Sequence, residues 1–251
     1  MDADPRARAI AFRHATHARV CDRLEPWAHG TAVFSSRLPG YWDYNVVRLE
    51  GPGPGLAAEA LMRELEVIQA PLAHRRLEVE DEATGARLRG DFAARGWATE
   101  RLVWLHRHGP PAGAAEAEEV PFAQTRPLRV EWTRASPWPR DEADVQSFMD
   151  LEQVVAELRA TRAVVARGDD GTPIGFATFS VAGDAAEIEQ AYVTPERRDA
   201  GIGGRLVAAA AAAAGTPEVF IVADDEGESK RLYRRLGFEP VWFKFDFTRR
   251  P

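Results

Sequence analysis

Residues 197–204 read RRDAGIGG, the most informative run of the chain. It follows an apolar run at 188–193, which we expect to be a strand, and it precedes seven alanines at 208–214, which predict a helix. A strand, a glycine-rich loop and a helix N-terminus form an anion site, because the first N–H groups of a helix are unpaired and the helix dipole is positive there. Glycine lets a phosphate approach the backbone with no Cβ in the way.

The details of the loop distinguish between kinds of phosphate site. It lacks the Lys-Ser/Thr pair that ends a nucleotide P-loop, and Leu206 occupies the place of the third glycine of a dinucleotide fingerprint. What fits is Arg-x-x-Gly-x-Gly, carried by Arg198, Gly201 and Gly203. This pattern resembles the acyl-CoA pyrophosphate loop of the GNAT N-acyltransferase superfamily.

A second motif follows at the spacing of that superfamily. Residues 226–238 read EGESKRLYRRLGF, in which Leu232-Tyr233 and Gly237-Phe238 match a helix that closes at Gly-Phe. Glu226 and Ser229 stand where the family often has Asn and Ala. The two motifs, in this order, extend the resemblance over about residues 126–251.

Composition limits the classes of protein. The 251 residues are 45% hydrophobic and 28% charged, which predicts a globular chain. No run of 18 apolar residues is present to cross a membrane, and the charged N-terminal stretch lacks the apolar core of a signal peptide, so we expect a cytoplasmic protein. A net charge of −7 disfavours a nucleic-acid partner and mildly favours a cationic substrate such as an amine.

Cysteine and histidine usage predicts no metal and no disulfide. Cys21 is the one cysteine, so an intramolecular disulfide is impossible, and its place between Val20 and Leu24 favours a buried structural thiol. The histidines, such as His106 and His108, are not arranged at the spacing of a convincing metal site.

Two breaker clusters organise the chain: GPGPG at 51–55, and the run GPPAGAAEAEEV at 109–120. We expect a linker at 111–122 between a domain at 1–110 and a domain at 123–251. A predicted helix at 82–95 that ends in Gly-Trp echoes the helix at 227–236 that ends in Gly-Phe. The chain therefore resembles a tandem-GNAT protein whose first copy is degenerate. This copy has no Arg-x-x-Gly-x-Gly, so we expect it not to bind CoA and to support the second domain and wall its cleft rather than to catalyse independently.

The expected fold class is mixed α/β, with two GNAT-like domains, each a mixed twisted sheet flanked by helices. Hydrophobic periodicity predicts helices at 6–25, 56–69, 82–95, 141–159, 203–214 and 227–236. It predicts strands at 31–37, 43–49, 76–80, 101–107, 127–132, 162–168, 173–181, 185–193, 218–223 and 240–247.

The resemblance implies transfer of an acetyl group from acetyl-CoA to an amine, by direct attack in a ternary complex. Such a reaction needs a base for the amine, a donor for the thioester oxygen and a proton for the leaving thiolate, but no covalent nucleophile. Tyr233 matches the family tyrosine that protonates the thiolate. Glu187 and Glu189, two apart on one strand, are the candidate bases, and we expect Gln190 and Tyr192 on the opposite face of the sheet.

The resemblance also implies the contacts of the co-substrate. The backbone of 191–193 is expected to bind the pantetheine amides and the thioester oxygen, the loop is expected to bind the pyrophosphate, and the second motif lines the same site. The cofactor-binding candidates are Ala191, Tyr192, Val193, Arg198, Asp199, Ala200, Gly201, Ile202, Gly203, Gly204, Ser229 and Tyr233. Lys230 is an alternative phosphate contact or a solvated surface lysine.

The partners expected are acyl-CoA and an amine of unknown identity, a small molecule or a peptide, with no metal, nucleic acid or membrane. Trp132, Trp138 and Phe148 either form an aromatic wall of the acceptor site or pack in the core. The aromatic positions of strand 240–247 pack either in the core or at a dimer contact, so the chain is a monomer or a homodimer. The alternative function is a non-catalytic acyl-CoA-binding sensor or scaffold.

Overall fold

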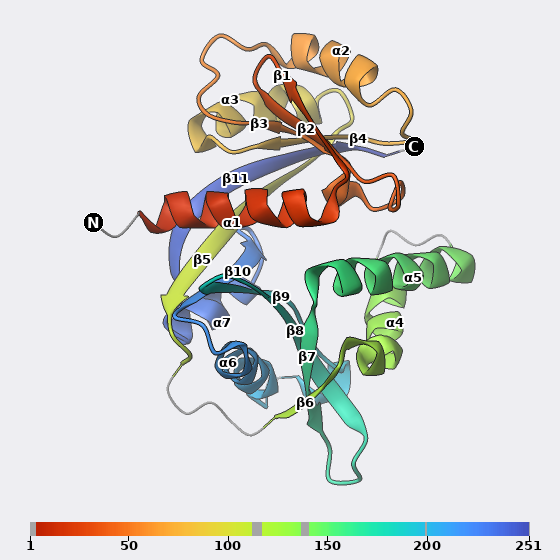
Figure 1. The fold of residues 1–251 in the computed structure, drawn as a ribbon, viewed down its shortest axis with the longest axis vertical. Coiled ribbons are helices and arrows are strands. Elements are labelled where there is room, and N and C mark those ends of the chain that lie inside the picture. The colour runs from red at the N-terminus through yellow and green to blue at the C-terminus, as the bar shows by residue number, and fades with distance from the viewer. Residues whose placement is uncertain (1–3, 112–116, 137–140, 199, 251) are drawn as a thin grey trace.

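The computed structural model describes residues 4–111, 117–136, 141–198 and 200–250. They form one mixed sheet of eleven strands with helices on its two faces (Figure 1). The helices are α1 Pro5–Val20, α2 Ala58–Ile68, α3 Glu82–Ala93, α4 Arg126–Arg134, α5 Glu142–Arg159, α6 Ile202–Ala214 and α7 Ser229–Arg235. The strands are β1 Arg23–Trp27, β2 Gly30–Phe34, β3 Val46–Leu49, β4 Arg75–Val79, β5 Ala98–His108, β6 Glu118–Pro121, β7 Arg162–Arg167, β8 Pro173–Ala182, β9 Ala185–Val193, β10 Glu218–Asp224 and β11 Glu239–Arg249.

The strand order is β1-β2-β3-β4-β11-β5-β10-β9-β8-β7-β6, so the two halves of the chain exchange their last strands. β11 lies antiparallel between β4 and β5, and β5 lies antiparallel between β11 and β10. These two long strands run side by side through the middle of the molecule (Figure 1). A single sheet therefore joins the regions that the sequence predicts as two domains, while the boundary at 111–122 stays a prediction.

Directly paired residues show which helices share a face. Phe243 of β11 pairs with Val103 of β5, and both pack in the core beneath α6 and α7. Phe245 and Phe247 have the same parity on β11 and pack in the core beneath α2 and α3. The four helices α2, α3, α6 and α7 therefore cover one face, and the aromatic side chains of β11 belong to the core.

Helix α1 covers the opposite face, where Phe12 packs with Phe220 and Trp104. Burial at one end of α1 also confirms the prediction for Cys21, whose side chain is enclosed and whose thiol pKa is raised by burial to about 12. Among the described residues, no helix combines the length and the apolar character needed to cross a bilayer.

Most predicted elements are confirmed, including strand β9, the glycine loop and the alanine helix α6, which ends at Gly215 with φ 66°. The strand predicted at 127–132 is wrong. This segment is helix α4, whose buried residues Leu128, Arg129 and Thr133 follow helical spacing. The expected helix at 6–25 ends at Val20, and the following residues form β1, which no pattern predicted because its side chains are exposed or half-buried.

Candidate active site

The N-terminus of α6 lies against two other predicted parts of the site. Gly201 adopts φ 71° at the start of the helix, and no side chain of the described residues caps the first turn. A Cβ placed on Gly203 would lie 3.8 Å from Val193 Cγ2 of β9 and 3.6 Å from Leu232 Cδ2 of α7. These contacts place the end of β9, the start of α6 and the helix α7 at one point of the molecule.

The loop between β9 and α6 leaves the first helical turn open. Residues Pro195–Arg197 form a 3-10 turn, and the Arg198 side chain returns to the end of β9, where Nε donates to the Val193 carbonyl at 3.4 Å. Arg205 donates to the Ala200 carbonyl at 3.0 Å. Asp199 lies outside the described residues. The exposed guanidinium of Arg198 adds positive charge beside unpaired N–H groups, an arrangement suited to a pyrophosphate.

β9 and β10 diverge beside this helix. Their parallel pairing ends at Ile188 and Ile221, whereas β9 continues to Val193 along β8. In the described part of the chain, the edge of 189–193 that faces β10 therefore has no strand partner. Ala191 and Val193 stand at this edge beside α6, so their backbone groups are available to an extended amide-containing ligand.

A β-bulge at Glu189 changes the faces of β9. Thr178 pairs with Gln190 and Phe179 pairs with Ile188, which leaves Glu189 as an extra residue. The prediction that Gln190 and Tyr192 lie on the opposite face from the two glutamates was wrong, because the bulge reverses the alternation that follows it.

All four polar side chains of β9 face the layer of α4 and α5. Gln190 donates to Glu152 of α5 at 2.6 Å, and the Tyr192 hydroxyl donates to Glu131 of α4 at 2.6 Å. Trp132 lies over Tyr192, with ring centroids 6.2 Å apart. Trp138 lies outside the described residues.

The two candidate bases share one buried cation. Arg159, the last residue of α5, lies 2.7 Å from a carboxylate oxygen of Glu187 and 3.4 Å from one of Glu189. Thr161 donates to Glu189 at 3.3 Å. Burial raises the pKa of Glu189, although Arg159 opposes this shift. A carboxylate with a raised pKa is suited to accept a proton from an amine or from water near neutral pH.

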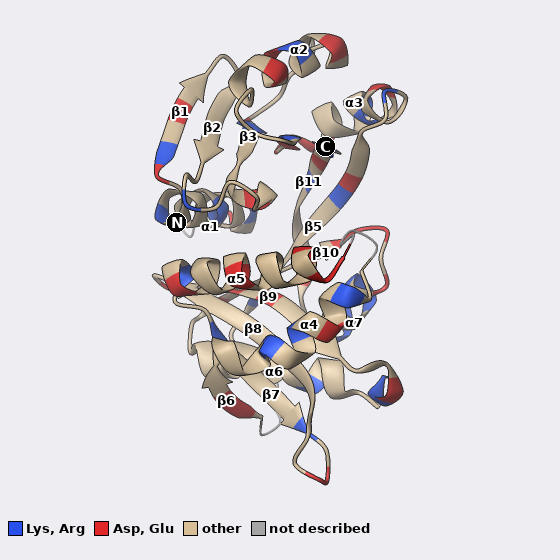
Figure 2. Ribbon diagram, turned by 90° about the vertical axis from the view of Figure 1, so that its right-hand side faces the viewer, with Lys and Arg blue, Asp and Glu red and all other residues tan. Residues whose placement is uncertain are grey.

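Tyr233 lies in the core formed with α6 and is 8% exposed. Burial raises the pKa of its hydroxyl, and a hydrogen bond with Ser229 opposes the shift. A buried phenol keeps its proton and can donate it to a thiolate. Basic residues cover the helix that carries it (Figure 2). Lys230 is already paired with Asp225 at 2.9 Å, which favours its reading as a surface lysine.

The N-terminal half reaches this site through a loop that the sequence did not single out. Tyr41 stacks on Phe148 of α5, with ring centroids 5.5 Å apart and planes 12° apart. The nearby charges of Glu152 and Glu189 add to the effect of burial in raising the pKa of Tyr41. Tyr41, Glu152 and Arg159 are thus candidate site residues that sequence reasoning missed. Glu152 and Arg159 bind β9, and Tyr41 packs on α5, only through long-range packing.

The corresponding loop of the N-terminal half is already occupied by protein contacts. The N–H of Gly53 donates to Thr84 at 2.9 Å, and Arg87 donates to the Gly53 carbonyl at 2.6 Å. Pro52 and Pro54 have no N–H to offer. These contacts agree with the expectation that the first half lacks a CoA loop.

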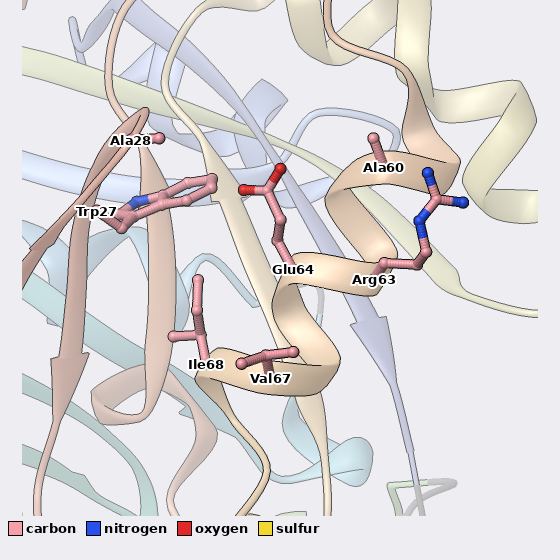
Figure 3. A pocket seen from close by; sticks show the side chains of 7 residues that line it. All are labelled: Trp27, Ala28, Ala60, Arg63, Glu64, Val67 and Ile68. Carbon is pink, nitrogen blue, oxygen red and sulfur yellow. The ribbon is translucent and has the colours of Figure 1, made fainter.

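A separate surface pocket of about 460 Å³ lies in the N-terminal half, between the β1–β2 hairpin and α2 (Figure 3). Its side chains are those of Trp27, Ala28, Ala60, Arg63, Glu64, Val67 and Ile68. None of them is a predicted site residue, so this pocket is distinct from the place where β9, α6 and α7 meet.

Folding brings together two groups of possible metal ligands that sequence spacing did not show: His106, His108 and Glu218, and His14, Glu50 and Glu80. In the first group both histidines pair with Glu218, which also lies 3.2 Å from Arg8. A cation of the protein therefore already contacts the carboxylate, and the group carries no metal proposal.

The structure thus combines a mixed sheet, two diverging strands and a helix that starts at a glycine in the left-handed conformation. Residues 123–238 match the model of the acetyltransferase (GNAT) family, and this part of the chain belongs to that family. The family uses acetyl-CoA as its co-substrate. No curated protein is a significant match to the chain.

Solved structures with the same fold span nearly the whole chain. A functionally unknown conserved protein from Staphylococcus epidermidis has a TM-score of 0.72 at 17% identity and covers 91% of this chain and 94% of its own. A GCN5-related N-acetyltransferase from Kribbella flavida has a TM-score of 0.65 at 18% identity, with 98% and 96% covered. A tandem GNAT protein from the clavulanic acid biosynthesis pathway has a TM-score of 0.51 at 14% identity, with 89% and 80% covered.

Proposed function

We propose that the protein is an acetyl-CoA-dependent N-acetyltransferase that acts on an amine, with its active site in the domain at 123–251. The observation that carries this proposal is the meeting of the open edge of β9, the uncapped N-terminus of α6 and α7, the helix that carries Tyr233. These three features supply, in one place, donors for the pantetheine and thioester, a pyrophosphate site and a proton for the thiolate.

In this proposal the backbone of 191–193 holds the extended arm of acetyl-CoA and donates to the thioester oxygen as negative charge develops there. N–H groups of the loop and of the first turn of α6 bind the pyrophosphate beside Arg198, with Ser229 and Tyr233 lining the same site. The open edge of β9 and the first turn of α6 then bond to the ligand through backbone groups that bond to water in the free protein.

The acceptor amine must lose a proton to attack, because an alkylammonium has a pKa near ~10.4. Glu189 accepts that proton, directly or through water, and Glu187 is the second candidate. The nitrogen lone pair forms the new C–N bond, the C–S bond breaks, and Tyr233 donates its proton to the CoA sulfur. The nitrogen then releases its extra proton, which returns through water to the Tyr233 phenolate and leaves a neutral amide. Arg159 holds the two carboxylates in place, 2.7 Å from Glu187 and 3.4 Å from Glu189.

The role proposed for the N-terminal half, residues 1–110, is to wall the acceptor side of the cleft. Its loop at Tyr41 packs on α5, and its own glycine loop is filled by Thr84 and Arg87. The linker at 111–122, the cytoplasmic location and the choice between monomer and homodimer stay predictions of the sequence.

The rival function is a non-catalytic acyl-CoA-binding sensor or scaffold. Two ion pairs of the second motif support this rival function: Glu226 pairs with Arg89 at 2.7 Å, and Lys230 pairs with Asp225. Neither residue therefore offers a free group to CoA. Acetyl-CoA turnover with any amine separates the two functions, since a sensor binds without turnover.

The first test is calorimetric titration with acetyl-CoA of the wild type and of the double variant Gly201→Glu, Gly203→Glu. We expect micromolar binding to the wild type, about −8 kcal/mol, and its loss in the variant, because two carboxylates would fill and repel the phosphate position. Glu59→Gln, on the exposed start of α2, is the control and should bind as the wild type does. Absence of binding to the wild type would refute both the enzyme and the sensor.

A further inference from the structure

A pocket of about 360 Å³ lies between the two halves of the chain. Its walls come from the loop before β3, from β4, from the ends of β5 and β11, and from α5. The lining residues used below are Tyr41, Trp42, Asp43, Glu100, Phe148 and Arg250. The N-terminal half supplies most of this wall, and α5 of the GNAT domain closes it.

The charges on this wall fall into a paired set and an unpaired set. Asp43 is paired with Arg76 at 2.8 Å, and Arg76 also binds Asp246 at 2.7 Å. Glu100 and Arg250 have no ion-pair partner among the residues that the structure describes. Burial in the wall raises the pKa of Glu100, and the charge of Arg76, which is already bound to Asp43 and Asp246, opposes this shift without forming an ion pair with Glu100.

The two unpaired charges have opposite signs and stand apart. Glu100 of β5 pairs in register with Asp246 of β11, and Arg250 comes four residues further along that chain. Four extended residues span roughly 13 Å of backbone. The side chains of Glu100 and Arg250 shorten the distance that a ligand must bridge between the two charged groups. The Arg250 guanidinium is held over the ring of Trp42, 5.8 Å from its centroid.

Aromatic rings line the space between these charges. Tyr41 and Phe148 are stacked, and Trp42 lies next to Tyr41 in the chain. Rings of this kind favour an apolar body and also stabilise an ammonium through the negative face of the ring. The pocket therefore offers an anion, a cation and an apolar wall to one ligand.

The pocket lies beside the proposed site of acyl transfer. Phe148 precedes Glu152 by one turn of α5, and Glu152 accepts a hydrogen bond from Gln190 of β9 at 2.6 Å. On the other side, the charge of Asp224, the last residue of β10, acts on Glu100. The pocket is thus connected to β9 through α5 and to the end of β10 through β5, while its lining residues come from other elements.

We propose that this pocket binds the acceptor as a zwitterion, an amino acid or short peptide with an apolar body. Glu100 holds its ammonium end and Arg250 holds its carboxylate. That the bound zwitterion is the acceptor rests on the proposed function. The binding of a zwitterion in the pocket does not, and it can be measured by itself. The N-terminal half then determines which amine reaches the acetyl group.

The test uses matched probes that differ only in a carboxylate: L-phenylalanine with phenethylamine, and L-lysine with cadaverine, together with glycyl-L-phenylalanine. Each probe is titrated, in the presence of CoA, into the wild-type full chain and into the variants Glu100→Gln, Arg250→Ala and, as the control, Glu59→Gln. In a separate assay with acetyl-CoA, the free thiol of the released CoA measures acetyl transfer. Acetyl-CoA affinity of every variant is measured alongside.

We expect a zwitterionic probe to bind and to be acetylated. Glu100→Gln should weaken both members of its pair by about tenfold, whereas Arg250→Ala should weaken only the member with the carboxylate by about tenfold. Acetyl-CoA affinity and the control should stay unchanged.

Three results would each overturn the pocket assignment. Arg250→Ala could weaken the affinity for both members of a matched pair equally, Glu100→Gln could leave the affinity for every probe unchanged, or no zwitterionic probe could bind although acetyl-CoA does. Probe binding without transfer would instead refute the proposed reaction and leave the pocket assignment standing.

Discussion

Tyr233 carries the sharpest prediction at the residue scale. Its ring is fixed in the core of α6 and α7, so Tyr233→Phe keeps the packing and removes only the hydroxyl, with a loss of about 1 kcal/mol of stability for the bond to Ser229. If the hydroxyl protonates the thiolate, turnover should fall by about 10²-fold or more while acetyl-CoA affinity stays within about twofold. Steady-state kinetics with calorimetry measures both. An unchanged turnover number would remove Tyr233 as the acid.

Residues that lie in contiguous motifs could be predicted, and residues that orient them could not. Arg198, Gly201, Gly203 and Tyr233 are in runs whose spacing alone carries information. Arg159, by contrast, lies 28 positions from Glu187 and meets it only when α5 packs against β9. The bulge at Glu189 could not be predicted either, because the alternation of residues along a strand does not show where an extra residue is inserted.

At the scale of elements, a buried ion cluster joins α1, β4 and β11. Glu78 of β4 is fully buried and lies 2.9 Å from Arg13 of α1 and 2.7 Å from Lys244 of β11. Glu78→Gln removes the carboxylate beside Arg13 and leaves Lys244 with Asp246 alone, at 2.8 Å, which should cost ~3–5 kcal/mol near pH 7. Urea unfolding followed by circular dichroism measures the loss, with Glu59→Gln as the control.

The same cluster gives that variant a defined pH dependence. Burial alone would raise the pKa of Glu78, but Arg13 and Lys244 outweigh burial and hold the pKa well below its usual range. A carboxyl with a lowered folded-state pKa stabilises the fold above its unfolded pKa of ~4.3, and this contribution is lost as the pH falls through the folded pKa. The gap between wild type and Glu78→Gln should therefore shrink below about pH 4. A gap that is constant with pH would contradict the assignment.

Helices and strands were predicted correctly where the apolar residues follow either the helical or the strand period, and poorly where they fit both. The apolar strand β10 and the alanine helix α6 have only one reading. In the segment 127–132, Leu128, Val130 and Trp132 alternate as in a strand, yet the burial of Leu128, Arg129 and Thr133 is helical. The exchange of β5 and β11 left no trace in any local pattern, because strand order is a property of the folded sheet.

At the scale of the molecule, the exchanged strands predict one cooperative unit. A fragment of residues 1–110 lacks β11, so β4 and β5 lose the strand between them and Phe92 loses its stacked partner Phe247 at 4.4 Å. We expect the full chain to unfold in a single thermal transition and the fragment to show none. Scanning calorimetry of both tests this, and a cooperative transition in the isolated fragment would contradict it.

The place of β11 also sets an order of events during synthesis. Strands β1 to β5 leave the ribosome first, but the sheet they belong to stays incomplete until residues 239–249 have been made. Until then the facing edges of β4 and β5 present unpaired backbone groups, which is the kind of edge on which nascent chains associate. The N-terminal half, although translated first, is therefore among the last parts of the molecule to reach its final form.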